Sequence, residues 1–229
     1  IPIGTYTIYE DEKTVPTAYL VADPQNVTVT YAETKEVPIE NKEKTGSITV
    51  HKTTEGQKNI EGIKFYLRGT SDSGRAIDIP ATTDKDGIAK FDGVPIGTYM
   101  VIEDEETVPY GYLVADEKEV KVEYAQTIDE AILNNEQTGT FKVHKKTADM
   151  TNVEGIRFIL SGISDTGREI RIEATTDKDG LAKFEGVPVG TYTITEDGST
   201  VPYGYLVADS KQVTVAYAQT VETAMVKEK

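Results

Sequence analysis

The chain has 229 residues, of which 38% are hydrophobic and 28% are charged, a composition typical of a folded globular protein rather than a disordered one. Its formal net charge of −15, with Lys and Arg scattered among acidic residues, argues against a nucleic-acid or anionic-membrane surface. No apolar run is long enough to span a bilayer, and the lack of Cys with only two His excludes thiolate chemistry and His-rich metal sites, so we expect no cofactor.

The sequence repeats itself with a period of 93 residues. PIGTY begins at Pro2 and Pro95 and returns as PVGTY at Pro188, and YLVAD recurs at the same spacing. This period exceeds that of most solenoid repeats, so each repeat should bury its own core as an autonomous domain. We expect a segment of a longer array, made of the C-terminal half of a repeat (1–45), a complete domain (46–138) and a domain with an altered last strand (139–229).

Within a repeat, apolar and polar residues alternate with a period of two, which predicts strands rather than helices. In the complete repeat the predicted strands are, in chain order, 47–53, 62–68, 75–79, 87–91, 97–103, 118–125 and 129–134. Gly, Pro and Asp separate them, and Asp86-Gly87 predicts a β-hairpin. About seven strands per repeat indicate an all-β fold of tandem immunoglobulin-like antiparallel β-sandwiches. In residues 1–45 the pattern predicts about three strands, one of which is 37–41.

Three kinds of polar residue fall on the apolar faces of these strands. In the complete repeat they are Lys52 in the first strand, Glu103 in the fifth and Asn134 in the last. Their equivalents elsewhere in the chain are Lys145, Glu196, Glu10 and Asn41. A Lys, a Glu and an Asn from three different strands are therefore expected in the interior of a sandwich.

Burial disfavours charge, so it lowers the pKa of a Lys and raises the pKa of a Glu. A neutral amine is a nucleophile, and a protonated carboxyl group can hydrogen-bond to an amide oxygen and relay protons. Lys52 Nζ can therefore attack Cγ of Asn134, with loss of ammonia, beside Glu103. The same residues also suit a buried Lys–Glu ion pair with Asn as a hydrogen-bond partner, and alternation alone leaves both interpretations open.

The run from Tyr99 through Val101 to Glu103, followed by Pro109, Gly111 and Tyr112, carries a family resemblance. It resembles the E-box of the B-type domains of Gram-positive collagen adhesins (CnaB-like domains), which also occur in pilin shafts, and the resemblance extends over the whole 93-residue unit. Two extra residues between Glu103 and Pro109 depart from the common pattern and should lengthen a loop. The resemblance implies a spontaneous Lys52–Asn134 isopeptide bond with Glu103 as catalytic residue, and it gives Glu196 and Glu10 the same catalytic role.

The other copies lack part of this set. In the third repeat, Lys145 has no electrophile, because the position of Asn134 is taken by Lys227 or, with a shift of one residue, by Val226. The N-terminal half has the opposite deficit, since Asn41 has no Lys. Lys145 and Asn41 are therefore unpaired crosslink candidates.

These features predict a structural stalk or shaft segment of a secreted, extracellular adhesin or pilin on the Gram-positive cell surface, wall-anchored or in a pilus, and not an enzyme. Its partners would be neighbouring repeats of the same chain and, through a distal domain, host extracellular matrix or glycan, with no nucleic acid and no membrane insertion.

Two alternatives remain open. An adhesin module could bind matrix or glycan through loop residues such as Tyr110 and Tyr203, although near-identical loops in successive repeats argue against one specialised site. A turnover enzyme could use Glu103 with Lys52, although both groups should be buried. Residues 84–87 resemble the centre of a calcium loop, but the distal Glu is missing, so we expect no metal.

Overall fold

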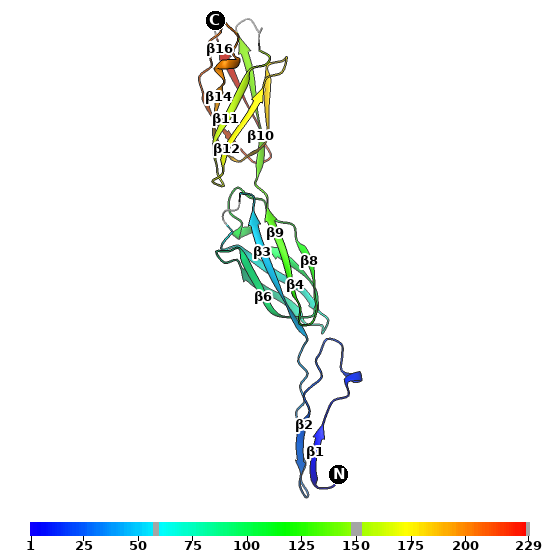
Figure 1. Ribbon diagram of the computed structural model, residues 1–229. Helices are drawn as coiled ribbons and strands as arrows, with labels where there is room; N and C mark the ends of the chain where they lie inside the picture. Colours follow the sequence, from blue (N-terminus) through cyan, green and yellow to red (C-terminus); the bar gives the residue numbers. More distant parts are fainter. Residues whose placement is uncertain (57–59, 148–152, 228–229) are drawn as a thin grey trace. The chain divides into compact units, whose positions relative to one another are not determined.

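The computed structural model of the chain describes residues 1–56, 60–147 and 153–227 as a series of β-sheets (Figure 1). These residues divide into two compact units, one made of 1–52, 60–107 and 116–132, the other of 53–56, 108–115 and 133–227. Within the described ranges, helical structure is limited to short 3-10 turns at Glu12–Thr14, Glu105–Thr107 and Gly198–Thr200. None of the described helices has the length and apolar character that crossing a membrane requires. The expected all-β fold is confirmed.

The complete repeat forms seven strands in two sheets. The strands are β3 (Thr45–Thr54), β4 (Lys64–Ser71), β5 (Ala76–Thr82), β6 (Ile88–Pro95), β7 (Gly97–Glu103), β8 (Lys118–Val122) and β9 (Thr127–Asn134). One sheet has the order β6-β3-β9 and the other the order β5-β4-β7-β8. Ile48 and Val50 of β3 and Phe65 and Leu67 of β4 are fully buried, as alternation predicts for the inner faces of a sandwich.

The third repeat has the same topology. Its strands are β10 (Thr138–Thr147), β11 (Arg157–Ser164), β12 (Glu169–Thr175), β13 (Leu181–Pro188), β14 (Gly190–Glu196), β15 (Lys211–Val215) and β16 (Thr220–Lys227). They form the sheets β13-β10-β16 and β12-β11-β14-β15. Phe141 from one sheet and Phe158 and Tyr192 from the other belong to a single buried cluster. The two sheets therefore enclose one core.

The pairing of the first and last strands departs from the antiparallel pattern in both sandwiches: in the complete repeat, the N–H of Ser47 donates to the carbonyl oxygen of Gln126 and the N–H of Glu55 to that of Asn134, so β3 and β9 run parallel. The first and last strands of the third repeat, β10 and β16, run parallel, from Thr140 opposite Thr220 to Thr147 opposite Lys227. The remaining strand pairs of the described sheets are antiparallel. Side-chain alternation is the same in both arrangements, so the sequence pattern could not distinguish them. The register also places Lys145 opposite Met225, which puts Lys227 two positions further on.

The expected hairpin at Asp86-Gly87 is wrong. The turn joins β5, in the four-stranded sheet, to β6, in the three-stranded sheet, so the two strands are not hydrogen-bonded neighbours. Gly87 adopts a left-handed φ of 75°, and Asp84 Oδ1 accepts hydrogen bonds from the N–H groups of Asp86 (2.9 Å) and Ile88 (3.0 Å). The Asp-Gly pair correctly marks a tight turn, but this turn crosses between sheets, and the carboxylate that binds its backbone is that of Asp84 rather than that of Asp86.

Residues 1–44 form a two-stranded antiparallel sheet of β1 (Gly4–Ile8) and β2 (Gln25–Val29). The predicted third strand at 37–41 is not formed, and Ile39 is 42% exposed. In the third repeat the last strand pairs with the first strand, and residues 1–44 contain no counterpart of that first strand. Without this partner, the backbone of 37–41 has no ladder to join.

Candidate crosslinking site

In the complete repeat, Lys52 and Glu103 meet inside the sandwich. Lys52 lies on β3 of the three-stranded sheet and Glu103 ends β7 of the four-stranded sheet. Their side chains are 0% and 1% exposed, and Nζ lies 3.7 Å from Oε1 of the carboxylate. The burial predicted from alternation is thus found for both residues, and the pair bridges the two sheets.

Burial lowers the pKa of Lys52 to about 8, and the nearby Glu103 carboxylate opposes this shift without cancelling it. A buried amine with this pKa is neutral in a substantial fraction of molecules at mildly alkaline pH. Its Nζ also donates to the carbonyl oxygen of Ile132 on β9, at 3.5 Å. Ile132 precedes Asn134 by two residues on the same strand, so both side chains point to the same face of β9.

Asn134, the last residue of β9, is completely buried, as predicted. Its Nδ2 donates to the carbonyl oxygen of Leu113 at 2.5 Å. Leu113 belongs to the recurring YLVAD segment, which marks the repeat in the sequence but contains none of the predicted site residues. The segment supplies backbone groups that fix the polar side chains of the site.

The third repeat holds a buried ion pair in the equivalent place. Lys145 Nζ lies 2.6 Å from Glu196 Oε1, and the two side chains are 1% and 0% exposed. Glu196 Oε2 accepts a hydrogen bond from the N–H of Ala208, also in a YLVAD segment, at 2.5 Å. Opposite Lys145 stands the buried apolar side chain of Met225. This repeat has Lys227 at the sequence position of Asn134, so its Lys and Glu are found without the Asn of the complete repeat.

The N-terminal half brings the other two members together. Asn41 Nδ2 donates to Glu10 Oε2 at 2.6 Å and to the carbonyl oxygen of Leu20 at 2.9 Å. Glu10 Oε2 also accepts from the N–H of Ala22 at 2.9 Å. Both side chains are only partly buried, unlike their equivalents in the complete repeats. The bond from Asn41 to Leu20 repeats the bond from Asn134 to Leu113, so the YLVAD carbonyl orients the amide in both copies.

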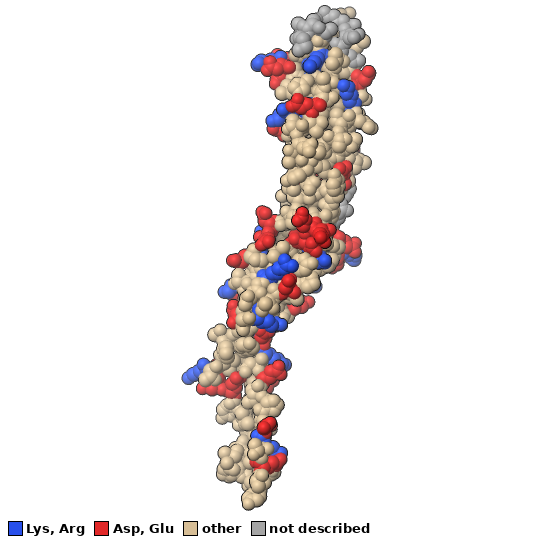
Figure 2. Space-filling view, turned by 180° about the vertical axis from the view of Figure 1, so that it is seen from behind, with Lys and Arg blue, Asp and Glu red and all other residues tan. Residues whose placement is uncertain are grey.

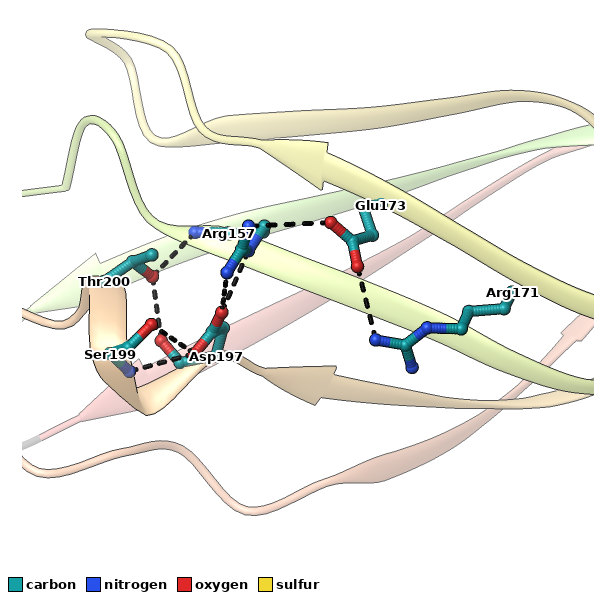
Figure 3. Close-up of polar contacts among 6 residues, drawn as sticks. All are labelled: Arg157, Arg171, Glu173, Asp197, Ser199 and Thr200. Carbon is teal, nitrogen blue, oxygen red and sulfur yellow. Dashed lines mark hydrogen bonds and ion pairs between the residues drawn. The ribbon is translucent and has the colours of Figure 1, made fainter.

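The end of β14, where Glu196 lies, is fixed by a polar network on the neighbouring surface (Figure 3). Arg157 on β11 contacts Asp197 and holds the pKa of that carboxyl down at about 2. Asp197 Oδ1 accepts from the N–H and hydroxyl groups of Ser199, at 2.9 and 2.7 Å, and Thr200 Oγ1 accepts from the N–H of Arg157 at 2.9 Å. These contacts tie the residue after Glu196 to the adjacent strand and so orient the buried carboxylate.

The outer surface of the described residues is mixed in charge. On the face shown in Figure 2, Lys and Arg are interspersed with Asp and Glu. The loop residues Tyr110 and Tyr203 are 76% and 106% exposed. Within the described ranges, no group of three or more His, Cys, Asp or Glu is arranged to hold a metal ion.

The comparisons with known proteins address the fold and the family. The chain resembles a solved structure of the Bacillus anthracis TIE protein, with a TM-score of 0.63, 23% identity and coverage of 92% of this chain and 38% of that one. It thus spans well under half of that relative. Weaker likenesses include a Streptococcal ancillary pilin (TM-score 0.39, 20% identity, 98% and 76% covered) and the Lactobacillus rhamnosus GG shaft pilin SpaA (0.35, 16%, 80% and 97%).

No curated protein sequence matches the chain. The family model of the SpaA prealbumin-like fold domain matches it twice, at residues 46–137 and 139–229. The two matches cover most of the chain and confirm the resemblance to CnaB-like domains of Gram-positive surface proteins and pilins. The chain therefore belongs to the SpaA family of prealbumin-like fold domains.

Proposed function

We propose that the chain is a structural stalk segment of a Gram-positive pilus or surface adhesin, stiffened by an isopeptide bond within its complete repeat. Tandem prealbumin-like domains support a structural role rather than an enzymatic one. The proposed setting is extracellular, on a wall-anchored protein or a pilus. The principal partners would be neighbouring repeats, and contacts with host matrix or glycan would be made by a distal domain.

The proposed bond joins Lys52 Nζ to Asn134 Cγ. The neutral amine attacks the amide carbon, while Glu103, in its protonated form, hydrogen-bonds to the amide oxygen and stabilises the developing negative charge. The tetrahedral intermediate collapses when a proton passes through Glu103 to the amide nitrogen, which leaves as ammonia. One C–N bond forms and one breaks, so the reaction occurs once per molecule and consumes the nucleophile.

The observation that carries this proposal is the burial of Lys52 and Glu103 at a separation of 3.7 Å, with the pKa of Lys52 lowered to about 8. An ammonium ion inside a protein is costly unless it is well paired, and this amine reaches a neutral, nucleophilic state more readily than an exposed Lys. Asn134 supports the proposal because it is buried on the strand whose Ile132 carbonyl contacts the same Nζ.

The mass of the intact, denatured chain tests the proposal. We expect the wild-type mass to fall short of the sequence mass by one ammonia, and Glu103→Gln to restore the full mass. Glu196→Gln is the matched control, since the third repeat has Lys227 at the sequence position of Asn134 and no bond is expected there. Peptide mapping of the wild type should recover Lys52 and Asn134 in one branched peptide. The full sequence mass in folded wild-type protein would refute the proposed bond and leave the stalk role to be judged separately.

A further inference from the structure

A glutamate precedes the first strand of each repeat and is bound in the same way at both positions. Glu43 lies two residues before β3 and Glu136 two residues before β10. Each belongs to a short bridge with the preceding loop, Tyr19 pairing with Glu43 and Tyr112 with Glu136. Neither glutamate takes part in the proposed crosslinking chemistry.

The carboxylate of Glu136 is held by the turn between β11 and β12. Thr166 Oγ1 donates to one oxygen and Arg168 donates to the other. The Glu136 side chain is 0% exposed. A buried carboxylate is costly unless it is paired, and here a hydroxyl and a guanidinium engage both of its oxygens.

The turn itself is a closed structure that presents these donors. The N–H of Ser164 donates to the carbonyl oxygen of Arg168, and the N–H of Gly167 donates to the carbonyl oxygen of Ser164, both at 2.8 Å. The hydroxyls of Ser164 and Thr166 are 2.7 Å apart, and the N–H of Arg168 donates to Ser164 Oγ at 3.0 Å. Because the turn is closed by its own hydrogen bonds, the Thr hydroxyl and the Arg side chain are preorganised for a carboxylate.

The same arrangement occurs 93 residues earlier. The turn Ser71-Asp72-Ser73-Gly74-Arg75 has the same internal hydrogen bonds, with Ser71 and Ser73 hydroxyls 2.7 Å apart. Ser73 donates to Glu43 Oε1, and an Arg75 guanidinium nitrogen lies 2.8 Å from Glu43 Oε2. Two copies with different hydroxyl residues, Ser in one and Thr in the other, make the same contact.

The backbone on both sides of Glu136 is also fixed. Gln137 N–H donates to the carbonyl oxygen of Gly111 at 2.7 Å, and Leu113 N–H donates to that of Asn135 at 2.9 Å. The carbonyl oxygen of Gln137 accepts from the N–H of Val189, which lies between β13 and β14, at 3.0 Å. The linker is therefore bonded to loop 108–115 on one side and to the third repeat on the other, all within one compact unit.

We propose that the Ser-Asp-[Ser/Thr]-Gly-Arg turn is a carboxylate-binding socket whose ligand is the glutamate of the preceding linker, and that this contact locks the joint between successive repeats. The recognised group is the linker carboxylate at a fixed distance before the first strand; at Arg168, Glu55 Oε1 also lies 3.8 Å from the guanidinium. This lock is independent of the isopeptide bond, because it uses none of the same residues. It gives Arg75 and Arg168 a positioning role, because each guanidinium acts together with a hydroxyl to engage both oxygens of the carboxylate, which is buried in Glu136 and partly exposed in Glu43.

Distance measurement between two spin labels tests the lock in the full chain. The chain has no native Cys, so labels can be introduced by Tyr110→Cys and Lys178→Cys, both at highly exposed positions of the unit that contains Glu136. In the otherwise unchanged chain we expect a single narrow distance distribution. Glu136→Gln should broaden it, and Arg168→Gln should do the same from the opposite side of the contact.

Glu43→Gln is the matched control, because it removes the equivalent carboxylate at the other joint. It should leave the 110–178 distribution narrow but broaden a second distribution measured between Tyr9→Cys and Lys85→Cys, which are exposed residues of the other unit. Circular dichroism melting checks that each variant keeps its folded repeats. The proposal is overturned if the 110–178 distance distributions of folded Glu136→Gln and Arg168→Gln chains are as narrow as the 110–178 distribution of the Glu43→Gln chain. The intact mass is unaffected by these outcomes, so a failed lock and a failed crosslink are distinguishable.

Discussion

Replacing the buried lysine by methionine should destabilise the complete repeat much more than the third repeat. Lys52→Met and Lys145→Met each remove a lysine nitrogen that lies beside a buried glutamate, at 3.7 and 2.6 Å, and replace it with an apolar chain of similar length. Lys145→Met removes an ion pair, whereas Lys52→Met removes the proposed covalent bond, in which Lys52 carries an uncharged amide nitrogen. The loss of stability in Lys52→Met should therefore exceed the loss in Lys145→Met.

The size of that difference follows from the closed loop, which contains 134 − 52 = 82 residues. By the chain-entropy relation used for disulfides, a loop of this length adds roughly 4–5 kcal/mol to the free energy of unfolding. For a repeat of this size, that corresponds to a loss of roughly 20–35 °C in the unfolding midpoint. Lys145→Met should show none of this additional loss.

Differential scanning calorimetry of the full chain measures both effects, since each complete repeat should give its own transition. Single-repeat cleavage products, identified by mass, assign the transitions. Equal shifts of the two transitions in the two variants would show that Lys52 contributes only through its ion pair, and the crosslink reasoning would fail. A crosslink-sized shift in Lys145→Met would contradict the assignment of the third repeat as uncrosslinked.

Three further predictions follow from individual contacts. Gly139→Ala should lower the free energy of unfolding of the third repeat by about 2 kcal/mol or more, because the new Cβ would lie 2.4 Å from the carbonyl oxygen of Ala216. The control Gly186→Ala, at a position with φ 62° and open space around it, should lower it by only about 1 kcal/mol. Urea unfolding measures both. Burial raises the pKa of Tyr192 to about 12, and its hydroxyl donates to the carbonyl oxygen of Pro188 at 2.8 Å. The contribution of this hydroxyl to the free energy of unfolding should therefore be complete below about pH 10 and lost as the pH rises from about 10 through 12. Tyr192→Phe should abolish that part of the pH dependence of urea unfolding. Between the two complete repeats, limited proteolysis with mass readout should first cut within 139–227, and a first cut within 46–138 would contradict the stabilising role of the crosslink.

Much of the fold could be predicted because alternation reports burial directly. Lys52, Glu103 and Asn134 stand in phase with apolar neighbours, and all three are buried in the structure. The strand count per repeat could be predicted for the same reason. The alternation within one strand shows which of its side chains face the core, so inward-facing residues can be predicted from a single sequence.

The rest depends on which segments meet, and a single strand carries no such information. The parallel pairing of β10 with β16 and the crossing of the Asp86-Gly87 turn between sheets are properties of the topology. The roles of Leu113 and Ala208 are carried by backbone groups, which any residue except proline could supply in full. For Glu136, a signal was present, since Glu43 and its Ser-Asp-Ser-Gly-Arg turn recur at the same spacing, but a charged residue in a linker is usually solvent-exposed.

The parallel pairing of β10 and β16 determines how a tensile load is distributed within the third repeat. In a parallel pair, the beginning of one strand and the end of the other lie at opposite ends of the ladder, here Thr140 and Lys227. A force applied to the N-terminal end of β10 and the C-terminal end of β16, in opposite directions, acts parallel to the strands and therefore shears the ladder. All hydrogen bonds between Thr140 and Thr147 and their partners must then yield together, whereas an antiparallel pair pulled from one end would unzip them one by one. Even without a covalent bond, the β10–β16 hydrogen bonds of this repeat should resist extension together.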